Sequence, residues 1–540
     1  MLNSVVHAFS VSFPHPIEEL WAVVSDTNRL NELVGNPKYE AYEVLRDDGV
    51  VDVYGRLRAA GFVVEWLEVP VNWIENRWFE QVRRFSNGPL LELTARFEFS
   101  TGHDTCHCHI RLVAQPKNIL GRLIGKQAAA KFEKSTRKVL AEADKGLRAR
   151  EPIKFDYTVR LPASARVRAQ QIVETIEATS YGHGLAQQLA DYVLSAQEVD
   201  LWTLRPLALA RLWGVDERAV VELFLQAVKE GLLESRWDLL CPRCRVAKDK
   251  SLELEDLPEG VHCPSCNIDY ELDFSSNVEL AFSPGPAVRP VEYGFFCRSG
   301  PSVTPHIKGQ ITLEPGEDKA VPTTLVPGDY RVRTLESGGE LDVTWNGGHF
   351  PSINLAGDKV LAGAPAPLGE LALHNSSGVR RTMIIEDRSW RRDVLTAQRV
   401  TTLQAFRDLF SEQVLRAGDE IRISTITFMF TDLVGSTSLF AQVGDARAYQ
   451  IVREHFALLG GVVREYDGTI VKTIGDGLHA AFNAPDHAFH AAIAIETAVS
   501  NWRSQEPGVD VAVRIGLHTG SSISVNLNGR LDYYGSSVNM

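Results

Sequence analysis

The stretch that decides the fold of the C-terminal region is ISTITFMFTDLVGSTSLF, residues 423–440. Its first half is rich in β-branched and aromatic residues in alternation, which predicts a half-buried strand. The strand delivers Asp432 at its end, and Gly435, Ser436 and Thr437 then open a helix. Backbone amides and the helix dipole at such a junction favour a phosphate beside a carboxylate-bound metal. An ordinary turn with a serine cap would have the same sequence.

A second carboxylate lies in EYDGTIVKTIGDGLHAAF, residues 465–482. Two strand-like segments flank Gly-Asp-Gly, which predicts a hairpin with Asp476 at its tip. Asp432 and Asp476, at the ends of neighbouring strands, could hold two Mg²⁺ or Mn²⁺ ions about 3.5–4 Å apart. Taken alone, an aspartate in a turn commonly does no more than form the turn.

Four motifs occur in order over residues 423–540: FTDLVGST, VKTIGDG, VRIGLHTG and LDYYGSSVN. Together they closely resemble the catalytic domain of class III nucleotidyl cyclases. The resemblance implies a ferredoxin-like α/β fold and active sites at a head-to-tail homodimer interface. Four ordered motifs are far more specific than any one of them.

The resemblance assigns the metal and phosphate sites. It makes Asp432 and Asp476 the ligands of two Mg²⁺ or Mn²⁺ ions, with the Leu433 backbone beside them and residues 435–437 near the phosphates. Asn539 matches a donor to the α-phosphate in the transition state. The arginine that accompanies it in the family would fall at position 543, beyond this sequence, so we expect an incomplete catalytic core and assign the activity to the family type.

The resemblance also assigns purine recognition, to Lys472 and Asp532 of the partner protomer. An ammonium that donates to adenine N1 and a carboxylate that accepts from the N6 amine fit adenine, whereas guanine asks for the opposite polarity. Cyclases selective for guanine usually carry Glu and Cys at these positions. Lys472 and Asp532 therefore predict ATP as substrate, with cyclic AMP and pyrophosphate as products.

Residues 1–150 have the order strand, short helices, many strands and a long C-terminal helix. This α+β order resembles the START-like, helix-grip family, which implies an apolar cavity and an apolar small ligand. Trp66, Trp73, Trp78 and Phe79 could line such a cavity or fill the core, and filling the core is the default for buried aromatic residues.

Residues 165–237 predict a helical, winged-helix-like segment. Its second half has helix-turn-helix spacing, with Gly214 at the turn, Asp216 as N-cap and Gly231 as C-cap. A DNA-reading helix is basic, whereas Glu217, Glu222 and Glu230 outnumber Arg218 and Lys229 in the second helix. We therefore expect protein packing and no nucleic-acid partner.

Residues 238–275 contain two CxxC knuckles, Cys241 with Cys244 and Cys263 with Cys266, separated by eighteen residues. Four thiolates at this spacing suit a tetrahedral Zn²⁺ with no open position for catalysis. We predict a zinc ribbon with structural Zn²⁺, with a redox pair or a metal-free loop as the alternatives.

Two further regions precede the cyclase-like domain. Residues 280–386 carry Pro-Gly turns between short alternating strands, which predicts a β-sandwich. Residues 389–417 place apolar residues at mixed spacings of three and four, which predicts a linker or signalling helix. That helix could pack on its own domain or dimerise, because fewer than four clean heptads are present.

The composition fits a multidomain globular protein of 540 residues with a net charge of -13. This charge disfavours general polyanion binding. The N-terminus has no secretory signal and no stretch approaches a membrane span. Cys106, Cys108 and Cys297 give no disulfide framework. We expect a cytoplasmic protein without a membrane partner.

The leading interpretation is a multidomain α+β adenylate cyclase, homodimeric and regulated by its N-terminal modules. A binding scaffold whose cyclase homology region only dimerises is the competing class. A guanylate cyclase and a zinc-dependent DNA-binding regulator are the remaining alternatives, and the acidic second helix counts against the latter.

Overall fold

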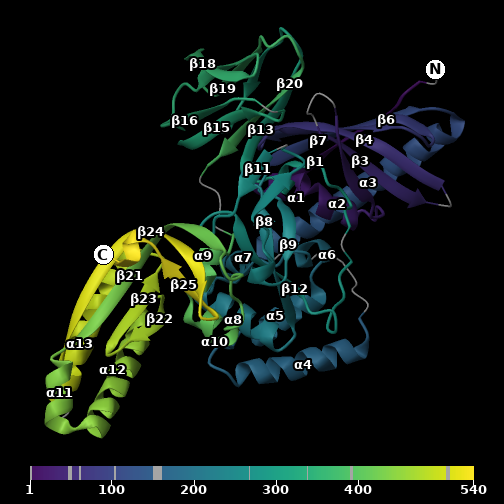
Figure 1. The fold of residues 1–540 in the computed structure, drawn as a ribbon. Coiled ribbons are helices and arrows are strands. Elements are labelled where there is room, and N and C mark those ends of the chain that lie inside the picture. The colour runs from purple at the N-terminus through teal and green to yellow at the C-terminus, as the bar shows by residue number, and fades with distance from the viewer. Residues whose placement is uncertain are drawn as a thin grey trace.

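The protein is described from a computed structural model that covers residues 3–46, 51–59, 62–102, 105–149, 161–266, 268–292, 294–336, 338–388, 393–505 and 511–539. Figure 1 shows its elements grouped into an N-terminal sheet with helices, a β-rich lobe, a helical centre and a C-terminal lobe. Within the described ranges, no helix is both long enough and apolar enough to cross a membrane.

The N-terminal region is one antiparallel sheet in the order β2-β3-β4-β5-β6-β7-β1, and helix α3 packs on β1 and β7. This arrangement has the predicted α+β order, and the START-like assignment stays a prediction. The elements are β1 (Val5–Phe13), α1 (Ile17–Ser25), α2 (Thr27–Leu33), β2 (Glu40–Leu45), β3 (Val51–Ala59), β4 (Phe62–Ile74), β5 (Trp78–Phe85), β6 (Leu90–Thr101), β7 (Cys106–Pro116) and α3 (Ile119–Ala149).

A cavity of about 420 Å³ lies between α2, α3 and the sheet. Of the four aromatic residues, Trp66 lines it, and the other three follow the default expectation that such residues pack in a core. Trp73 and Phe79 are part of the buried core, and Trp78 packs against the core of the β-rich lobe. The local sequence does not reveal one contact in this region: β4 pairs with a strand of that lobe at Trp73 and Ile74. A ligand in the cavity stays a prediction.

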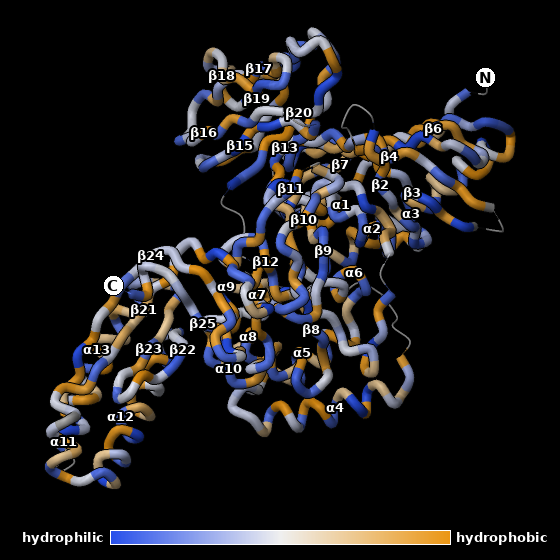
Figure 2. The backbone as a smooth tube through the Cα atoms, in the orientation of Figure 1, coloured by the Kyte–Doolittle hydropathy of each residue, from blue (hydrophilic) through white to orange (hydrophobic). Residues whose placement is uncertain are grey.

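The centre is helical, with a three-stranded sheet in the order β12-β8-β9. Hydrophobic and hydrophilic residues alternate along α4 (Figure 2), whose apolar residues are buried at spacings of three and four. The elements are α4 (Ala163–Glu177), α5 (Ala186–Ser195), α6 (Glu198–Leu201), α7 (Pro206–Trp213), α8 (Glu217–Lys229), β8 (Leu233–Leu240), β9 (Ala247–Ser251), β10 (Gly260–Cys263), β11 (Ile268–Glu271) and β12 (Val278–Pro284).

The turn between α7 and α8 forms as predicted. Gly214 ends α7 in the left-handed region at φ 67°, and the Asp216 side chain accepts a hydrogen bond of 2.9 Å from the Ala219 amide. Residues 220–227 of α8 are all buried. A recognition helix needs a free face for the DNA groove, and burial of this helix on every side therefore disfavours that role.

The β-rich lobe has two sheets around one apolar core that includes Ile311, Val332 and Phe350. Its first sheet, β13-β20-β15-β16, continues the N-terminal sheet, because β13 pairs with β4. The second has the order β14-β19-β17-β18. The strands are β13 (Ile307–Leu313), β14 (Asp318–Pro322), β15 (Gly328–Thr334), β16 (Glu340–Trp345), β17 (Pro351–Ala356), β18 (Lys359–Pro365), β19 (Glu370–Asn375) and β20 (Arg381–Asp387).

The prediction of one long helix over residues 389–417 is wrong. The described part of this segment contains two short helices, α9 (Ala397–Thr401) and α10 (Gln404–Leu409), and residues 389–392 lie outside the described ranges. The Thr401 hydroxyl donates to the Ala397 carbonyl at 2.8 Å, and the Thr402 hydroxyl donates to the Gln398 carbonyl at 3.0 Å. Such local bonds compete with the continuation of a helix.

The C-terminal lobe is a five-stranded antiparallel sheet in the order β22-β23-β21-β24-β25. Helices α12 and α13 cover one face. The other face, which includes Phe428 and Tyr533, shares a core with the helical centre, α9 and α10. The elements are β21 (Glu420–Val434), α11 (Ser436–Val443), α12 (Asp445–Glu465), β22 (Gly468–Ile474), β23 (Gly477–Phe482), α13 (Pro485–Gln505), β24 (Ala512–Leu527), β25 (Arg530–Tyr534) and α14 (Ser536–Asn539).

Candidate functional site

Asp432 lies near the end of the central strand β21, as predicted. The residue opposite it in the sheet is Arg514 of β24, whose Nη1 is 3.7 Å from Asp432 Oδ2. Both side chains are more than half exposed. The end of the strand therefore presents an accessible carboxylate beside one balancing positive charge.

Asp476 is brought to the same edge by a close backbone contact. The Leu478 amide donates to the Thr431 hydroxyl at 3.0 Å, and a Cβ at Gly477 would lie 2.4 Å from the Thr431 carbonyl oxygen. Only glycine permits that approach. Asp432 follows Thr431 and Asp476 precedes Gly477, so the two aspartates flank one contact between β21 and β23.

The orientation of Asp476 leaves one carboxylate oxygen buried. Asp476 Oδ2 has no hydrogen-bond partner among the described residues. A buried carboxylate oxygen without a partner is costly, and a bound cation would remove that cost. The two aspartates therefore fit hard divalent cations, which prefer oxygen ligands.

The turn after β21 is arranged as the sequence predicts. Gly435 adopts φ 75° and precedes α11. Leu433 is buried, so only its backbone can face a ligand. Ser436 opens the helix, while the side chain of Thr437 lies outside the described part of the structure. Asn539 is exposed at the end of α14.

The two predicted purine readers contact each other within one chain. Lys472 Nζ donates to Asp532 Oδ2 at 2.5 Å. The Asp532 side chain is 9% exposed and that of Lys472 is 38% exposed. A nearly buried carboxylate thus has its charge balanced by an ammonium that solvent still reaches.

His479 lies close to this pair, and sequence reasoning missed it. Its ring stacks on Phe430 with 4.3 Å between centroids, and neither ring nitrogen has a hydrogen-bond partner among the described residues. Burial lowers its pKa to about 4, against a rise from Asp532 and a further lowering from Lys472. The sequence around it, GLHAAF, looks like an ordinary buried strand and carries no signal of this position.

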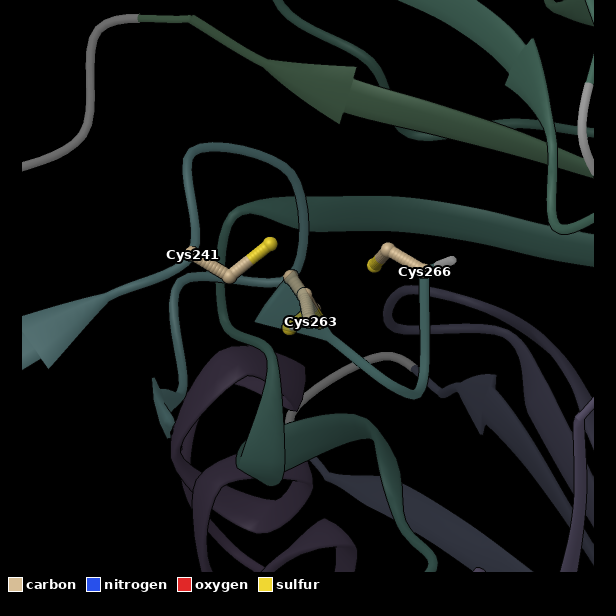
Figure 3. A group of neighbouring side chains, drawn as sticks. Cys241, Cys263 and Cys266 are labelled. Atoms are coloured by element: carbon tan, nitrogen blue, oxygen red, sulfur yellow. Dashed lines mark hydrogen bonds between the residues drawn. The ribbon is translucent and has the colours of Figure 1, made fainter. Parts of the chain in front are cut away.

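The four knuckle cysteines come together as predicted. Their sulfur atoms all lie within 4.8 Å of one another, and Figure 3 shows those of Cys241, Cys263 and Cys266 turned toward a common centre. A tetrahedral zinc with Zn–S bonds of about 2.3 Å places its sulfurs roughly 3.8 Å apart. The Cys244 and Cys263 sulfurs are 3.8 Å apart, so the cluster fits that geometry.

The loops that carry these cysteines also contact two other regions. Ser265 donates to Glu43 of β2 at 2.7 Å, and Lys248 donates to the same serine hydroxyl at 2.7 Å. On the other knuckle, the His306 ring donates to the Arg243 carbonyl at 3.0 Å. The cysteine cluster therefore lies where the N-terminal sheet, the helical centre and the β-rich lobe meet.

Two family models match the chain. Residues 419–540 match the adenylate and guanylate cyclase catalytic domain. Residues 168–294, from α4 to just past β12, match a family of unknown function, DUF5939. The C-terminal lobe is therefore a class III nucleotidyl cyclase catalytic domain. The second match spans both the predicted helical segment and the cysteine cluster.

Nucleotidyl cyclases among the curated proteins match about a fifth of the chain. Adenylate cyclase 1 of Rhizobium meliloti is 31% identical over 129 residues, covering 21% of this chain and 19% of the relative. The adenylate cyclase of Anabaena cylindrica is 30% identical over 21% of this chain and 26% of its own length. Retinal guanylyl cyclase 1 of Bos taurus is 29% identical over 18% of this chain and 10% of its own length. The chain thus spans about a fifth to a quarter of the length of the two bacterial relatives.

Solved structures of nucleotidyl cyclases match a similar share of the chain. The structure of a bacterial light-regulated adenylyl cyclase is 21% identical in sequence and has a TM-score of 0.22. The match covers 22% of this chain and 38% of the cyclase chain in that structure. The structure of the adenylyl cyclase CyaB from P. aeruginosa is 23% identical in sequence and has a TM-score of 0.20. The match covers 22% of this chain and 70% of the CyaB chain in that structure. The domain assignment rests on the family model and the curated relatives.

The buried His479 predicts acid sensitivity of this domain. The unfolded chain takes up the proton near pH 6.5 and the folded chain near pH 4. Unfolding is therefore favoured as pH falls through that window, and this group contributes up to about 1.4 kcal/mol per pH unit. The His479→Phe variant should flatten the pH dependence of the free energy of unfolding, measured by urea denaturation.

The control is His490→Phe, because His490 is exposed on α13. It should keep the wild-type slope between pH 4 and pH 6.5. Identical slopes for the wild type and His479→Phe would show that His479 titrates normally.

Proposed function

We propose that the C-terminal domain converts ATP into cyclic AMP and pyrophosphate in a homodimer, with two Mg²⁺ or Mn²⁺ ions at each active site. The observation that carries the choice of ATP is the Lys472–Asp532 pair, which presents one donor and one acceptor side by side. Adenine offers the complementary acceptor N1 and donor N6 on one edge. Guanine reverses that polarity, which would set donor against donor and acceptor against acceptor.

Asp432 and Asp476 are the proposed ligands of the two cations. Their positions on either side of the Thr431–Leu478 contact support a shared site. When bound, the ions would lower the pKa of the ribose 3'-hydroxyl and neutralise the leaving phosphates.

The chain's own groups would orient the nucleotide. The 3'-oxygen bonds to the α-phosphorus while the bond to the pyrophosphate oxygen breaks, and the hydroxyl proton is released to solvent. Amides of residues 435–437 would face the phosphates. The Asn539 amide would donate to the oxygens on which negative charge grows.

Exposed apolar side chains around the site support a dimer. Ile474 beside the Gly-Asp-Gly turn is 57% exposed, Tyr534 at the end of β25 is 60% exposed, and Leu517 of β24 is 38% exposed. Apolar residues gathered near a polar site are typical of an interface. The partner that fits is a second copy, which would carry the purine readers to the first copy's aspartates.

A mixing experiment tests the shared site. Asp432→Ala and Lys472→Ala should each lower cyclic AMP formation with Mn²⁺ by at least about 100-fold. Mixed in equal amounts, the two variants should recover about a quarter of wild-type activity, because half of random dimers are mixed and each has one intact site. Asp445→Ala, at an exposed position of the same domain, is the control. No recovery on mixing would contradict a site shared between protomers.

The purine assignment predicts a change of substrate. Lys472→Glu combined with Asp532→Cys should reverse the preference from ATP to GTP, because the new pair offers an acceptor where the old one offered a donor. The measurement is the ratio of kcat/KM for the two nucleotides. An ATP preference that survives both changes would remove these residues from purine recognition.

We also propose that the four-cysteine cluster holds a structural Zn²⁺. Three of its cysteines are buried, and four thiolates would close the coordination shell. The metal would then tie the two knuckles together where three regions of the protein meet.

This proposal predicts one zinc per chain by elemental analysis. Cys263→Ser should lose the metal and lower the melting temperature, because zinc binding contributes folding free energy. The control is Cys297→Ser, a buried cysteine outside the cluster, which should keep the zinc. A purified wild-type protein free of metal and equally stable with a chelator would count against a structural zinc.

A further inference from the structure

The two purine readers belong to strands at opposite edges of the sheet. Lys472 is on β22 and Asp532 is on β25, and β23, β21 and β24 lie between them. The ladder contacts of the described sheet join each of these strands only to its own neighbour. The direct contact between Lys472 and Asp532 at 2.5 Å therefore depends on how strongly the sheet twists and coils between its two edges, as well as on strand pairing.

Helix α10, which precedes the catalytic domain in sequence, holds the first of these strands. The Gln404 side-chain oxygen accepts a hydrogen bond from the Ile470 amide at 2.9 Å and from the Thr469 hydroxyl at 3.2 Å. Ile470 is two residues before Lys472. Because β22 is an edge strand, its outer backbone groups have no neighbouring strand to bond with. The Gln404 side chain accepts the hydrogen bond of one of these groups, the Ile470 amide.

The same helix holds the second strand through Arg407. Its Nη1 donates to the Leu531 carbonyl at 2.9 Å, and its Nη2 donates to the Tyr533 hydroxyl at 3.4 Å. The guanidinium also lies 5.7 Å from the centre of the Tyr533 ring. Leu531 and Tyr533 are the immediate neighbours of Asp532, so Arg407 holds β25 on both sides of the purine-reading carboxylate.

Polar and apolar contacts both join α10 to these strands. Phe406 of α10, Val471 of β22 and Leu531 of β25 belong to one apolar core. A cavity of about 240 Å³ beside them is lined by α10 together with residues of β22 and β25. The side chains of Gln404 and Arg407 add directional contacts that fix how each strand sits on the helix.

Helix α10 is in turn anchored on the region that matches the family of unknown function. Lys229 donates to the Leu409 carbonyl at 3.3 Å, and the Tyr181 hydroxyl donates to Asp408 at 3.2 Å. The Trp237 and Phe406 rings pack edge to face, 6.1 Å apart. The helix therefore has one side on the helical centre and the other on the purine-reading strands.

We propose that α10 is the positioning element for purine recognition, with Gln404 and Arg407 as positioning residues that set the separation of Lys472 and Asp532. This inference rests on the proposed function, since it takes those two side chains as the purine readers. Neither Gln404 nor Arg407 touches the purine. Purine affinity and the choice between ATP and GTP are thereby set from outside the catalytic domain, at a helix seated on residues 168–294.

In this proposal, purine binding and the chemical step depend on different contacts. Asp432 and Asp476 are held by the Thr431–Leu478 contact, to which α10 contributes no hydrogen bond in the described structure. Loosening β25 therefore weakens adenine binding and lets the pair adapt to guanine, while the aspartates stay in place. A merely structural role would lower the fraction of folded enzyme and leave KM and nucleotide preference unchanged.

The experiment compares Arg407→Ala, Arg407→Lys and Gln404→Ala in the full chain. Arg407→Ala and Gln404→Ala should each raise KM for ATP and lower the ATP-to-GTP ratio of kcat/KM by about tenfold, with kcat changed less than about threefold. Arg407→Lys keeps the charge and one donor, and should recover part of the ratio. The control is Arg416→Ala, whose side chain donates to the Glu255 carbonyl and to neither purine-reading strand.

A lower kcat with unchanged KM and unchanged nucleotide ratio in Arg407→Ala and Gln404→Ala would overturn the inference. If Arg407→Ala does not fold, Arg407→Lys and Gln404→Ala decide the question by the same ratio. If the wild type forms no cyclic nucleotide, the proposed function fails, and the role of α10 is still decided by the relative binding of ATP and GTP. That measurement is displacement of a fluorescent ATP analogue, and equal ratios in the wild type and variants overturn the inference.

Discussion

The structure depends on one apolar core that runs through the helical centre, α9, α10 and the open face of the cyclase sheet. It contains Val220 and Phe224 of α8, Phe406 of α10, and Phe428 and Tyr533 of the sheet. This sheet carries apolar residues on both faces, and α12 and α13 cover only one of them. Burial of each large side chain contributes about 1.5–3 kcal/mol. Separating the catalytic domain from the helical centre would expose many of them, so their burial holds these two regions together.

The N-terminal sheet and the β-rich lobe are joined to this unit and to each other differently. The two sheets pair at Gly309 with Ile74 and at Gln310 with Trp73, and they share apolar packing, because Ile307 and Ile384 of the lobe belong to the N-terminal core. The contacts of the N-terminal region with the helical centre include the ion pairs of Arg29 with Asp200 and Lys38 with Glu198 and the hydrogen bond of Ser265 with Glu43. A polar junction opposes relative domain motion less than a large apolar one does.

Sequence reasoning succeeded where the determinant is local. The two CxxC knuckles, the Gly214–Asp216 turn and the hairpin that presents Asp476 each depend on a few adjacent residues. It failed where distant segments compete or combine. The helix over residues 389–417 breaks at adjacent threonines, and the pairing of β4 with β13 joins two segments far apart in the sequence. Arg407 lies in no recognisable sequence motif. The residues to which it donates hydrogen bonds, Leu531 and Tyr533, come more than a hundred positions later in the chain.

The Lys472–Asp532 contact would also balance the charge of the proposed purine site while no purine is bound. A nearly buried carboxylate without a counter-charge would be expensive, and its pairing with Lys472 offsets that cost. In the proposed function, adenine would bridge the two groups and accept from one while donating to the other. Guanine would have to separate them and leave both polar groups mismatched in a site that water reaches poorly. Discrimination would then depend on how rigidly the pair is held, and in our proposal α10 and the shared core beneath it supply that rigidity.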